Sequence, residues 1–317
     1  MRTNAIASDR ELLAIPGLDL VADADLTQST SMKARARASL LAKVLCPRAL
    51  RSLLRLARER EWPVMILGGG TNTIFATKHF DGVVLSLDKG MFGRIDALGD
   101  NLLRAGAAAT LTRVIKQAHH NGMMGLEFCH KIPGQFGGAL AGNAGAAGWG
   151  VCDFVESAMI MTRSGRVVQV NRGDFRSGYR HSELAEGIIL EADLRLERLN
   201  EAIAYQRIQE FEEKKKGQPY HLPSSGCVFK NPRHPVTGEQ LYAGKLIDEA
   251  GLKGYTLNSA SVSEGHANFI VNTGAASGED FMGLINLIQD VVHEKFGVEL
   301  EVEARIVGGP LTSCVLA

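Results

Sequence analysis

Hydrophobic residues follow helical or alternating spacing along much of the first two thirds of the chain. After Pro47, an apolar stripe of leucines predicts a helix that runs toward Arg60. A second helix is expected over residues 111–120, where Asn121-Gly122 ends it. Strands are expected over residues 64–67, 82–85, 103–109, 167–170 and 188–190. Because these elements do not alternate as regular βαβ units, the pattern predicts an α+β fold.

The clearest pattern lies near the C-terminus. Ser277 and Asp280 have the spacing of a capping box, and apolar residues recur at helical spacing from Phe281 to Phe296, before Gly297. Strict alternation over residues 298–306 then predicts a strand. The side chains expected on one face of this strand are Glu299, Glu301, Glu303 and Arg305. From the pattern alone, this is an ordinary solvent-facing surface.

The composition points to small-molecule partners. The 317 residues carry a formal net charge of zero, so no basic field is available to hold nucleic acid or an acidic membrane surface. No apolar run is long enough to cross a bilayer, and the charged N-terminus lacks the apolar core of a signal peptide, so we expect a cytosolic protein. The five cysteines are scattered, which argues against a disulfide framework or a zinc site.

Two glycine-rich loops are the main candidates for ligand binding. Gly68-Gly69-Gly70-Thr71-Asn72 follows the apolar run of residues 64–67, and the loop IPGQFGGALAGNAG covers residues 132–145. One glycine triplet is more often a simple turn, but two amide-rich loops together favour a pyrophosphate ligand. Neither loop has the G-x-G-x-x-G or the G-x-x-x-x-G-K-[ST] pattern, so the Rossmann and P-loop folds do not apply.

Longer motifs resemble one enzyme family. The chain contains, in this order, LGGGTN, IPGQFGGALAGNAG, YRHSEL, QPYHLPSSGCVFKNP, AGKLIDEAGLKG, VSEGHANFIVN and EARIVG. Their order and spread, from about residue 25 to residue 308, closely resemble the UDP-N-acetylenolpyruvoylglucosamine reductases, also called UDP-N-acetylmuramate dehydrogenases. The ANFIVN segment and the compact C-terminal part resemble the second of the family's two subtypes.

The resemblance implies an α+β flavoenzyme of bacterial cell-wall synthesis. FAD would bind non-covalently to a two-part domain of the vanillyl-alcohol-oxidase type, over residues 1–85 and 86–203, followed by a substrate-binding domain over 204–308 and a tail over 309–317. The charged stretch 210–216 lies near the second boundary. The residues expected to bind FAD are Gly68, Gly69, Gly70, Thr71, Asn72, Ile132, Pro133, Gly134, Gly137, Gly138, Asn143, Ala144, Gly145 and Arg305.

The implied reaction needs a group that stabilises a developing enolate. NADPH would reduce the flavin, and flavin N5 would pass hydride to the enolpyruvyl group of UDP-N-acetylenolpyruvoylglucosamine. By position in the family's motifs, Arg180 and Glu303 would stabilise the enolate, and Arg305 would orient Glu303. Glu303 can help only if its surroundings raise its pKa. Without the resemblance, Tyr179-Arg180 would be an ordinary surface pair.

The proton donor departs from the family pattern. The family has serine within G-S-x-F-K-N-P, and this chain has Cys227 at that position. A thiol, with a pKa of about 8.5, is a stronger acid than an aliphatic hydroxyl and is still mostly protonated at neutral pH. We therefore expect Cys227 to donate the proton, with Ser225 as the second choice.

The resemblance also implies substrate contacts. The residues expected to bind the UDP-sugar are Tyr179, Lys216, Lys230 and Asn231. The expected partners are the UDP-sugar and NADPH, with no nucleic acid, membrane or metal, and we expect a monomer. Two alternatives stay open: another FAD-dependent oxidoreductase on the same scaffold, or a UDP-sugar binder that has lost catalysis.

Overall fold

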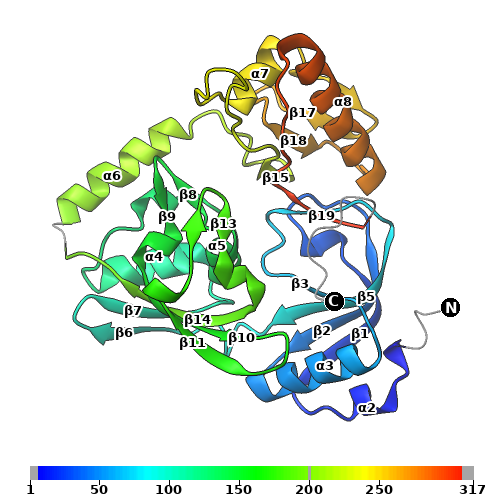
Figure 1. Cartoon of the computed structure of the whole chain (residues 1–317), viewed down its shortest axis with the longest axis vertical. Helices are drawn as coiled ribbons and strands as arrows, with labels where there is room; N and C mark the ends of the chain where they lie inside the picture. The colour runs from blue at the N-terminus through cyan, green and yellow to red at the C-terminus, as the bar shows by residue number, and fades with distance from the viewer. Residues whose placement is uncertain (1–5, 199–200, 309–317) are drawn as a thin grey trace.

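The computed structural model describes residues 6–198 and 201–308 and contains three sheet-based units (Figure 1). The predicted tail and Cys314 lie outside the described residues. The α+β class is confirmed, because the sheets are mixed or antiparallel and are not built from repeated βαβ units. Within 6–198 and 201–308, no helix has both the length and the apolar character that a membrane crossing requires.

The first unit is a four-stranded sheet in the order β1-β2-β5-β3. Strands β2 and β3 run parallel to β5, and β1 is antiparallel to β2. Helix α3 begins at Pro47 as predicted, since proline fits the first helical position, and its leucine stripe is buried. The bounds are α2 (Arg10–Leu13), β1 (Leu18–Asp25), β2 (Arg37–Val44), α3 (Pro47–Glu59), β3 (Val64–Ile66), β4 (Thr73–Phe75) and β5 (His79–Leu87).

The second unit is a five-stranded antiparallel sheet in the order β11-β10-β14-β7-β6. Its helix α4 has the predicted bounds and begins after Thr110, whose side chain accepts the amide of Arg113. The bounds are β6 (Ile95–Gly99), β7 (Leu102–Gly106), α4 (Leu111–His120), α5 (Phe136–Ala141), β10 (Val155–Met161), β11 (Val167–Asn171) and β14 (Ile188–Arg195).

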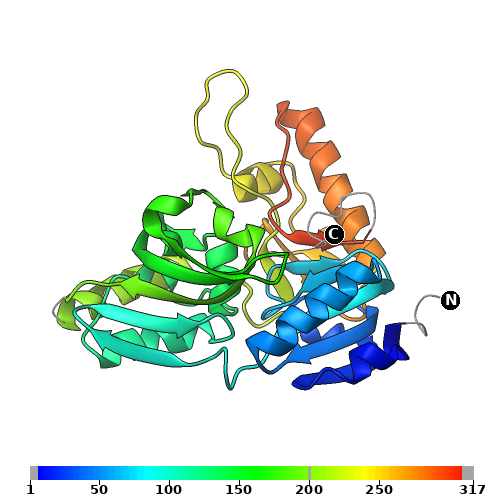
Figure 2. The same ribbon diagram turned by 60° about the horizontal axis from the view of Figure 1, so that its bottom comes forward.

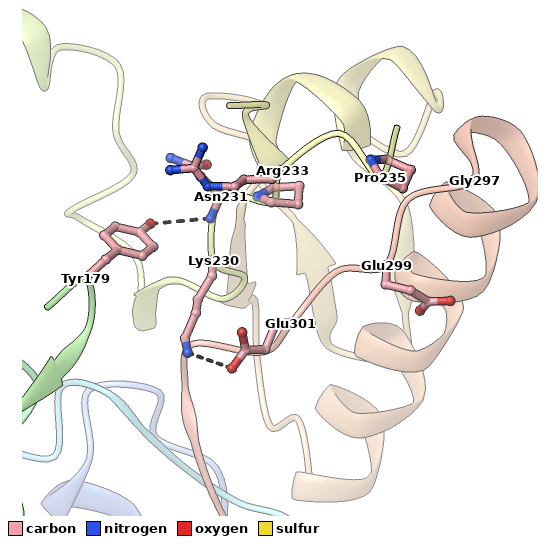
Figure 3. Close-up of a pocket in the computed structure, with 9 residues that line it drawn as sticks. Tyr179, Lys230, Asn231, Arg233, Pro235, Gly297, Glu299 and Glu301 are labelled. Carbon is pink, nitrogen blue, oxygen red and sulfur yellow. Dashed lines mark hydrogen bonds and ion pairs between the residues drawn. The ribbon is translucent and has the colours of Figure 1, made fainter. Parts of the chain in front are cut away.

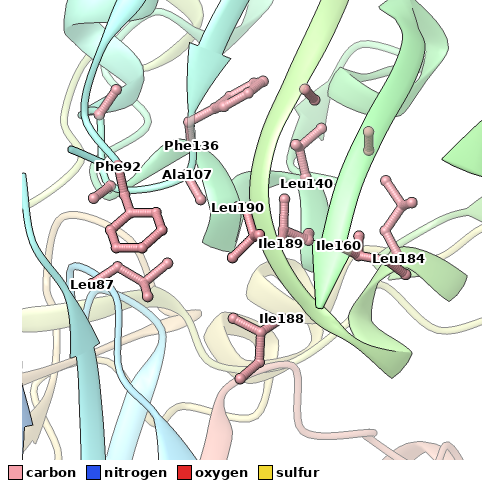
Figure 4. Close-up of a cluster of buried hydrophobic side chains, with 14 of the residues drawn as sticks. Leu87, Phe92, Ala107, Phe136, Leu140, Ile160, Leu184, Ile188, Ile189 and Leu190 are labelled. Atoms are coloured by element: carbon pink, nitrogen blue, oxygen red, sulfur yellow. The ribbon is translucent and has the colours of Figure 1, made fainter. Parts of the chain in front are cut away.

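One buried cluster joins these two sheets. It contains Leu40 and Val83 from the first sheet and Leu103 and Ile189 from the second. Figure 4 shows part of this cluster around Leu190 of β14. The first two sheets therefore share one hydrophobic core, and the boundary expected at residue 85 stays a prediction.

The third unit is a four-stranded sheet, β15-β18-β17-β16, with a largely separate core that includes Ile247, Phe281 and Ile288. The capping box of Ser277 and Asp280 is confirmed, and Gly297 ends α8 in the left-handed conformation at φ 64°. The bounds are β15 (Ser224–Cys227), α7 (Ala243–Glu249), β16 (Thr256–Leu257), β17 (Ala260–Val262), β18 (Phe269–Asn272) and α8 (Gly278–Phe296).

The C-terminal segment returns to the first unit. Strand β19 (Arg305–Val307) pairs in parallel with β4, placing Arg305 opposite Thr73. Figure 2 shows this segment running down from α8 toward the first unit. The segment therefore connects the third unit directly to the loop that precedes β4.

One expectation needs correction, and two regions contain elements that the sequence did not predict. Only residues 305–307 of the predicted strand 298–306 are a strand, with an isolated bridge between Val302 and Phe229, because this segment crosses between two units. The charged stretch 210–216 lies mostly in α6 (Glu201–Lys214), which contacts the 3-10 turn η2 (Glu127–Cys129). The region before Pro47 contains β1 and β2, which the sequence did not predict.

Candidate active site

The first glycine loop offers a run of unused backbone donors. In the described part of the chain, the amides of Gly68 to Asn72 donate to no acceptor. Gly70 has φ 63°, and a Cβ at this position would lie 2.1 Å from the carbonyl oxygen of Ser29. Only glycine fits there, and the loop keeps its amides available for a ligand.

The second glycine loop lies directly against the first. A Cβ on Gly69 would be 3.1 Å from Cα of Gly134, and Thr71 Oγ1 donates to the carbonyl of Pro133 at 3.3 Å. The amides of Ile132 and Gly137 bond to carbonyls within the chain. Among the described acceptors, none receives the amides of Gly134, Gln135 or Gly138. These three amides and those of Gly68 to Asn72 fit the pyrophosphate of a dinucleotide.

Asn143 supports the part of the site that carries Arg180. It is 7% exposed, its Nδ2 donates to the carbonyl of Gly178 at 2.8 Å, and its Oδ1 accepts the amide of Cys152 at 3.0 Å. The carbonyl of Gly145 accepts a bond from Arg180 Nη1 at 3.2 Å. The side chain of Asn143 therefore works within the chain, and cofactor contacts of the turn at residues 143–145 stay a prediction.

Arg180 and Glu303 form an ion pair between two units. Arg180 has φ 56° in the tight turn between β12 (Ser177–Gly178) and β13 (His181–Ser182). Its Nε lies 2.5 Å from Glu303 Oε1. Burial raises the pKa of the Glu303 carboxyl, although the positive charge of Arg180 opposes this effect. The pair can therefore hold or share a proton more readily than an exposed carboxylate.

Cys227 lies beside this pair at the end of β15. The backbone of the next residue is joined to the segment of Glu303, whose amide donates to the carbonyl of Val228 at 2.7 Å. Burial and, to a smaller extent, the charge of Glu303 raise the pKa of Cys227 to about 12. The thiol is therefore protonated at neutral pH, as a proton donor must be.

Ser225 is fully enclosed nearby. Its hydroxyl has no hydrogen-bond partner among the described residues, and a register shift separates Ser224 from Cys227 along β15. Gly226 has φ 80°, which breaks the regular alternation of side chains. In a regular strand, residues two positions apart have side chains on the same face. Because of this irregularity, that rule does not apply to Ser225 and Cys227.

Three of the predicted substrate-binding residues line one pocket. Tyr179, Lys230 and Asn231 surround an open cavity of about 460 Å³, and the amide of Asn231 donates to the Tyr179 hydroxyl at 3.3 Å (Figure 3). Lys230 Nζ lies 2.6 Å from Glu301 Oε1. Lys216 is not among the lining residues; it follows the end of α6 and pairs with Glu213 in the last turn of that helix.

The C-terminal segment also reaches the first glycine loop. Asn72 Nδ2 donates to the carbonyl of Glu303 at 3.2 Å, and the amide of Arg305 donates to the carbonyl of Asn72 at 2.9 Å. Arg305 Nη1 donates to the carbonyl of Ile66 at 2.8 Å, and the cation that pairs with Glu303 is Arg180. Arg305 therefore stabilises the backbone at both ends of the first glycine loop, and an orienting contact with Glu303 stays a prediction.

The three carboxylates expected on one strand face are separated. Glu299 pairs with His293, Glu301 with Lys230 and Glu303 with Arg180. The side chains of Glu299 and Glu301 are 81% and 71% exposed, whereas that of Glu303 is 14% exposed. Only Glu303 has the burial that acid–base chemistry requires.

Two basic residues outside the expected set of substrate-binding residues lie near the site. Arg233 also lines the pocket, and the only signal for it was a charged residue directly after the K-N-P motif. Lys215 points inward, because its Nζ donates to the carbonyl of His130, and burial lowers its pKa. By the resemblance, both Lys215 and Lys216 lie near the position of a basic residue for the diphosphate, and the structure shows that Lys215 is the more buried of the two.

Comparisons with known proteins agree with this architecture. A family model described as an FAD binding domain matches residues 39–171, and the model of the UDP-N-acetylenolpyruvoylglucosamine reductase C-terminal domain matches residues 218–307. The UDP-N-acetylenolpyruvoylglucosamine reductase of Geotalea uraniireducens is 40% identical over 285 residues, which cover 89% of this chain and 92% of the relative. That of Pelobacter propionicus is 37% identical over 291 residues, covering 91% and 96%.

A solved structure shares the whole arrangement. The crystal structure of UDP-N-acetylenolpyruvylglucosamine reductase from Thermus caldophilus matches with a TM-score of 0.76 and 30% identity, covering 91% of this chain and 98% of that chain. The fold and the two glycine loops thus define an FAD-binding oxidoreductase with a separate C-terminal domain. Within that class, the chain belongs to the UDP-N-acetylenolpyruvoylglucosamine reductase family.

Proposed function

We propose that this protein reduces the enolpyruvyl group of UDP-N-acetylenolpyruvoylglucosamine to give UDP-N-acetylmuramate, with NADPH as reductant, in peptidoglycan precursor synthesis. The proposal rests on one observation above all: Arg180, Glu303 and Cys227 come from three separate segments and meet beside the Tyr179–Asn231 pocket. The names of relatives at 40% and 37% identity support the same substrate.

The backbone of both glycine loops would hold the cofactor. The amides of Gly68 to Asn72, Gly134 and Gly138 are the donors for the pyrophosphate. When bound, FAD supplies the hydride through N5 of its flavin ring after NADPH has reduced it. The chain itself must then stabilise negative charge on the substrate and provide one proton.

Arg180 and Glu303 would perform the first of these tasks. Hydride addition to the substrate double bond moves charge onto the neighbouring carboxylate, and a planar guanidinium binds such a group with two parallel hydrogen bonds. Because the pKa of Glu303 is raised by burial, its carboxyl can share a proton with the developing enolate. The Gly145 carbonyl and the Glu303 carboxylate keep the guanidinium in place.

Cys227 would deliver the proton to the enolate carbon. Its thiol keeps the proton at neutral pH, because burial raises its pKa to about 12. The thiolate left after donation can regain a proton from solvent, since Cys227 is not fully enclosed. The high pKa also keeps the thiolate fraction low, which protects the sulfur from oxidation by peroxide.

Stopped-flow absorbance of the FAD-loaded protein tests the proposal in two steps. NADPH should bleach the flavin, and UDP-N-acetylenolpyruvoylglucosamine should restore its colour without oxygen while UDP-N-acetylmuramate forms. If the flavin is reduced but the sugar never reoxidises it, the proposed activity is wrong. If oxygen-dependent oxidation of sugars is found instead, another FAD-dependent oxidation replaces it.

A further inference from the structure

The loop of residues 231–242 is a projecting and internally bonded element beside the pocket (Figure 2). The amide of His234 donates to the carbonyl of Glu239 at 2.7 Å, and that of Gly238 donates to the carbonyl of His234 at 2.9 Å. At its base, Gln240 Nε2 donates to the carbonyls of Asn231 and Pro232 at 3.1 and 3.0 Å. These bonds give the loop a defined shape before any ligand binds.

Arg233 is held by this loop at the pocket. Its Nη1 donates to the carbonyl of Gly238 at 3.0 Å, and its side chain lines the cavity with Tyr179 and Asn231 (Figure 3). A guanidinium has five N–H donors, and this bond uses one. The remaining donors are therefore presented from a side chain whose orientation is already restricted, which lowers the entropy cost of binding.

The charges around the pocket single out the same residue. The two lysine and arginine side chains lining it are Lys230 and Arg233, and Lys230 is paired with Glu301 at 2.6 Å. The other carboxylate, Glu299, pairs with His293 at 2.9 Å. Among the ion pairs of residues 6–198 and 201–308, none includes Arg233. Arg233 is thus the cation of this cavity whose charge is left for a ligand.

We propose that Arg233 binds the diphosphate of the UDP-sugar and thereby sets the affinity for this substrate, an inference that rests on the proposed function. A cavity of about 460 Å³ is in the range that small-molecule ligands occupy. Phosphate oxygens match the planar fork of a guanidinium, and Tyr179 adds an aromatic wall on the opposite unit. The diphosphate would therefore lie between Arg233 and Tyr179.

A phosphate group could also come from NADPH, so the experiment separates the two sources. Calorimetry on the FAD-loaded protein would compare UDP with uridine, and kinetics would compare the UDP-sugar with NADPH and NADH. Arg233→Gln should weaken UDP binding about tenfold or more, since a hydrogen-bonded charge pair with phosphate is lost, and should leave uridine binding unchanged. It should raise KM for the UDP-sugar without changing kcat or the rate of flavin reduction by NADPH.

Two further variants complete the test. Arg233→Lys should recover part of the UDP affinity, because the charge returns without the fork. Arg198→Gln is the matched control, because Arg198 is also exposed, donates to Asn101 at 2.9 Å and lines a different pocket. This variant should change neither the affinity for UDP nor the KM for the UDP-sugar. Unchanged UDP affinity in Arg233→Gln overturns the proposal, and so does an effect confined to the choice between NADPH and NADH.

The failure of this inference is distinguishable from the failure of the proposed function. A wild-type protein that binds UDP through Arg233 but never reduces the enolpyruvyl sugar would contradict the proposed function alone. If the wild type reduces the sugar and Arg233→Gln does so with the same rate and the same KM, only the role of Arg233 is contradicted. A wild type that does not bind UDP contradicts both.

Discussion

Arg180 Nε and Glu303 Oε1 lie 2.5 Å apart although the two residues are 123 positions apart in the chain. Arg180 belongs to a hairpin of the second unit, and Glu303 to the segment that leads into β19. Both side chains are mostly buried, with exposures of 26% and 14%. The contact therefore joins the second unit to the C-terminal segment at the candidate site.

The first prediction concerns this pair. Arg180→Gln should lower the rate of hydride transfer to the enolpyruvyl sugar about 10²–10³-fold, because the developing negative charge loses its guanidinium. Glu303→Gln should be milder, since a neutral amide can still donate a hydrogen bond. Flavin reduction by NADPH and flavin reoxidation by the sugar would be followed separately by stopped flow. If a variant slowed flavin reduction by NADPH as much as flavin reoxidation by the sugar, the proposal that the pair acts only on the enolate would be wrong.

The second prediction concerns the proton donor. Cys227→Ala should reduce flavin normally but form product about 10²–10⁴-fold more slowly, because no acid faces the enolate carbon. Cys227→Ser should retain product formation. Cys46→Ala is a matched control, since Cys46 is also a partly buried free thiol, and it should behave as wild type. Full turnover by the alanine variant would assign the proton to another group, with Ser225 as the first to test.

The third prediction is a pH dependence. The protonated thiol is the donor, and burial raises the pKa of Cys227 to about 12, so the donor is lost only when the pH approaches that value. The rate of flavin reoxidation by the sugar should therefore show no thiol titration between about pH 7 and 10, where an ordinary thiol loses its proton. Single-turnover measurements across this range would check it, with Cys227→Ser as the control. A fall in this rate near the pKa of an ordinary thiol, seen in the wild type and absent in Cys227→Ser, would contradict the prediction. It would show that burial does not raise the pKa of Cys227.

The fourth prediction tests the cofactor loops without using activity. A Cβ at Gly138 would meet no atom within 4 Å, and Gly138 lies inside α5, so Gly138→Ala should keep or raise the stability of the apoprotein by about 0.5–1 kcal/mol. FAD affinity should fall, because the methyl group would occupy space beside a pyrophosphate donor.

Thermal unfolding and fluorescence titration with FAD would measure the two effects. Gly173→Ala, whose Cβ also meets open space, is the matched control and should bind FAD normally. Unchanged FAD affinity in Gly138→Ala would show that the Gly138 amide does not bind the pyrophosphate of FAD.

Elements whose signals are local could be predicted from the sequence. Helix α8 was predicted from the capping box at Ser277 and from Gly297, and helix α4 from its apolar spacing, because cap hydrogen bonds and side-chain periodicity involve residues within a few positions of each other. The segment 298–306 alternates like a strand but pairs only at Val302 and at residues 305–307. Its partners are Phe229 and β4, which no local pattern could reveal.

The sequence by itself determined the residue types and motifs that make the chemistry available: two glycine loops, a guanidinium at Arg180, a carboxyl at Glu303 and a thiol at Cys227. Only the tertiary structure decided which of them meet. It paired Glu303 with Arg180, left Lys216 at the surface and placed Arg233 in the pocket. The physical reason is that pKa shifts and ion pairs depend on burial and on distances across the chain, which sequence spacing does not specify.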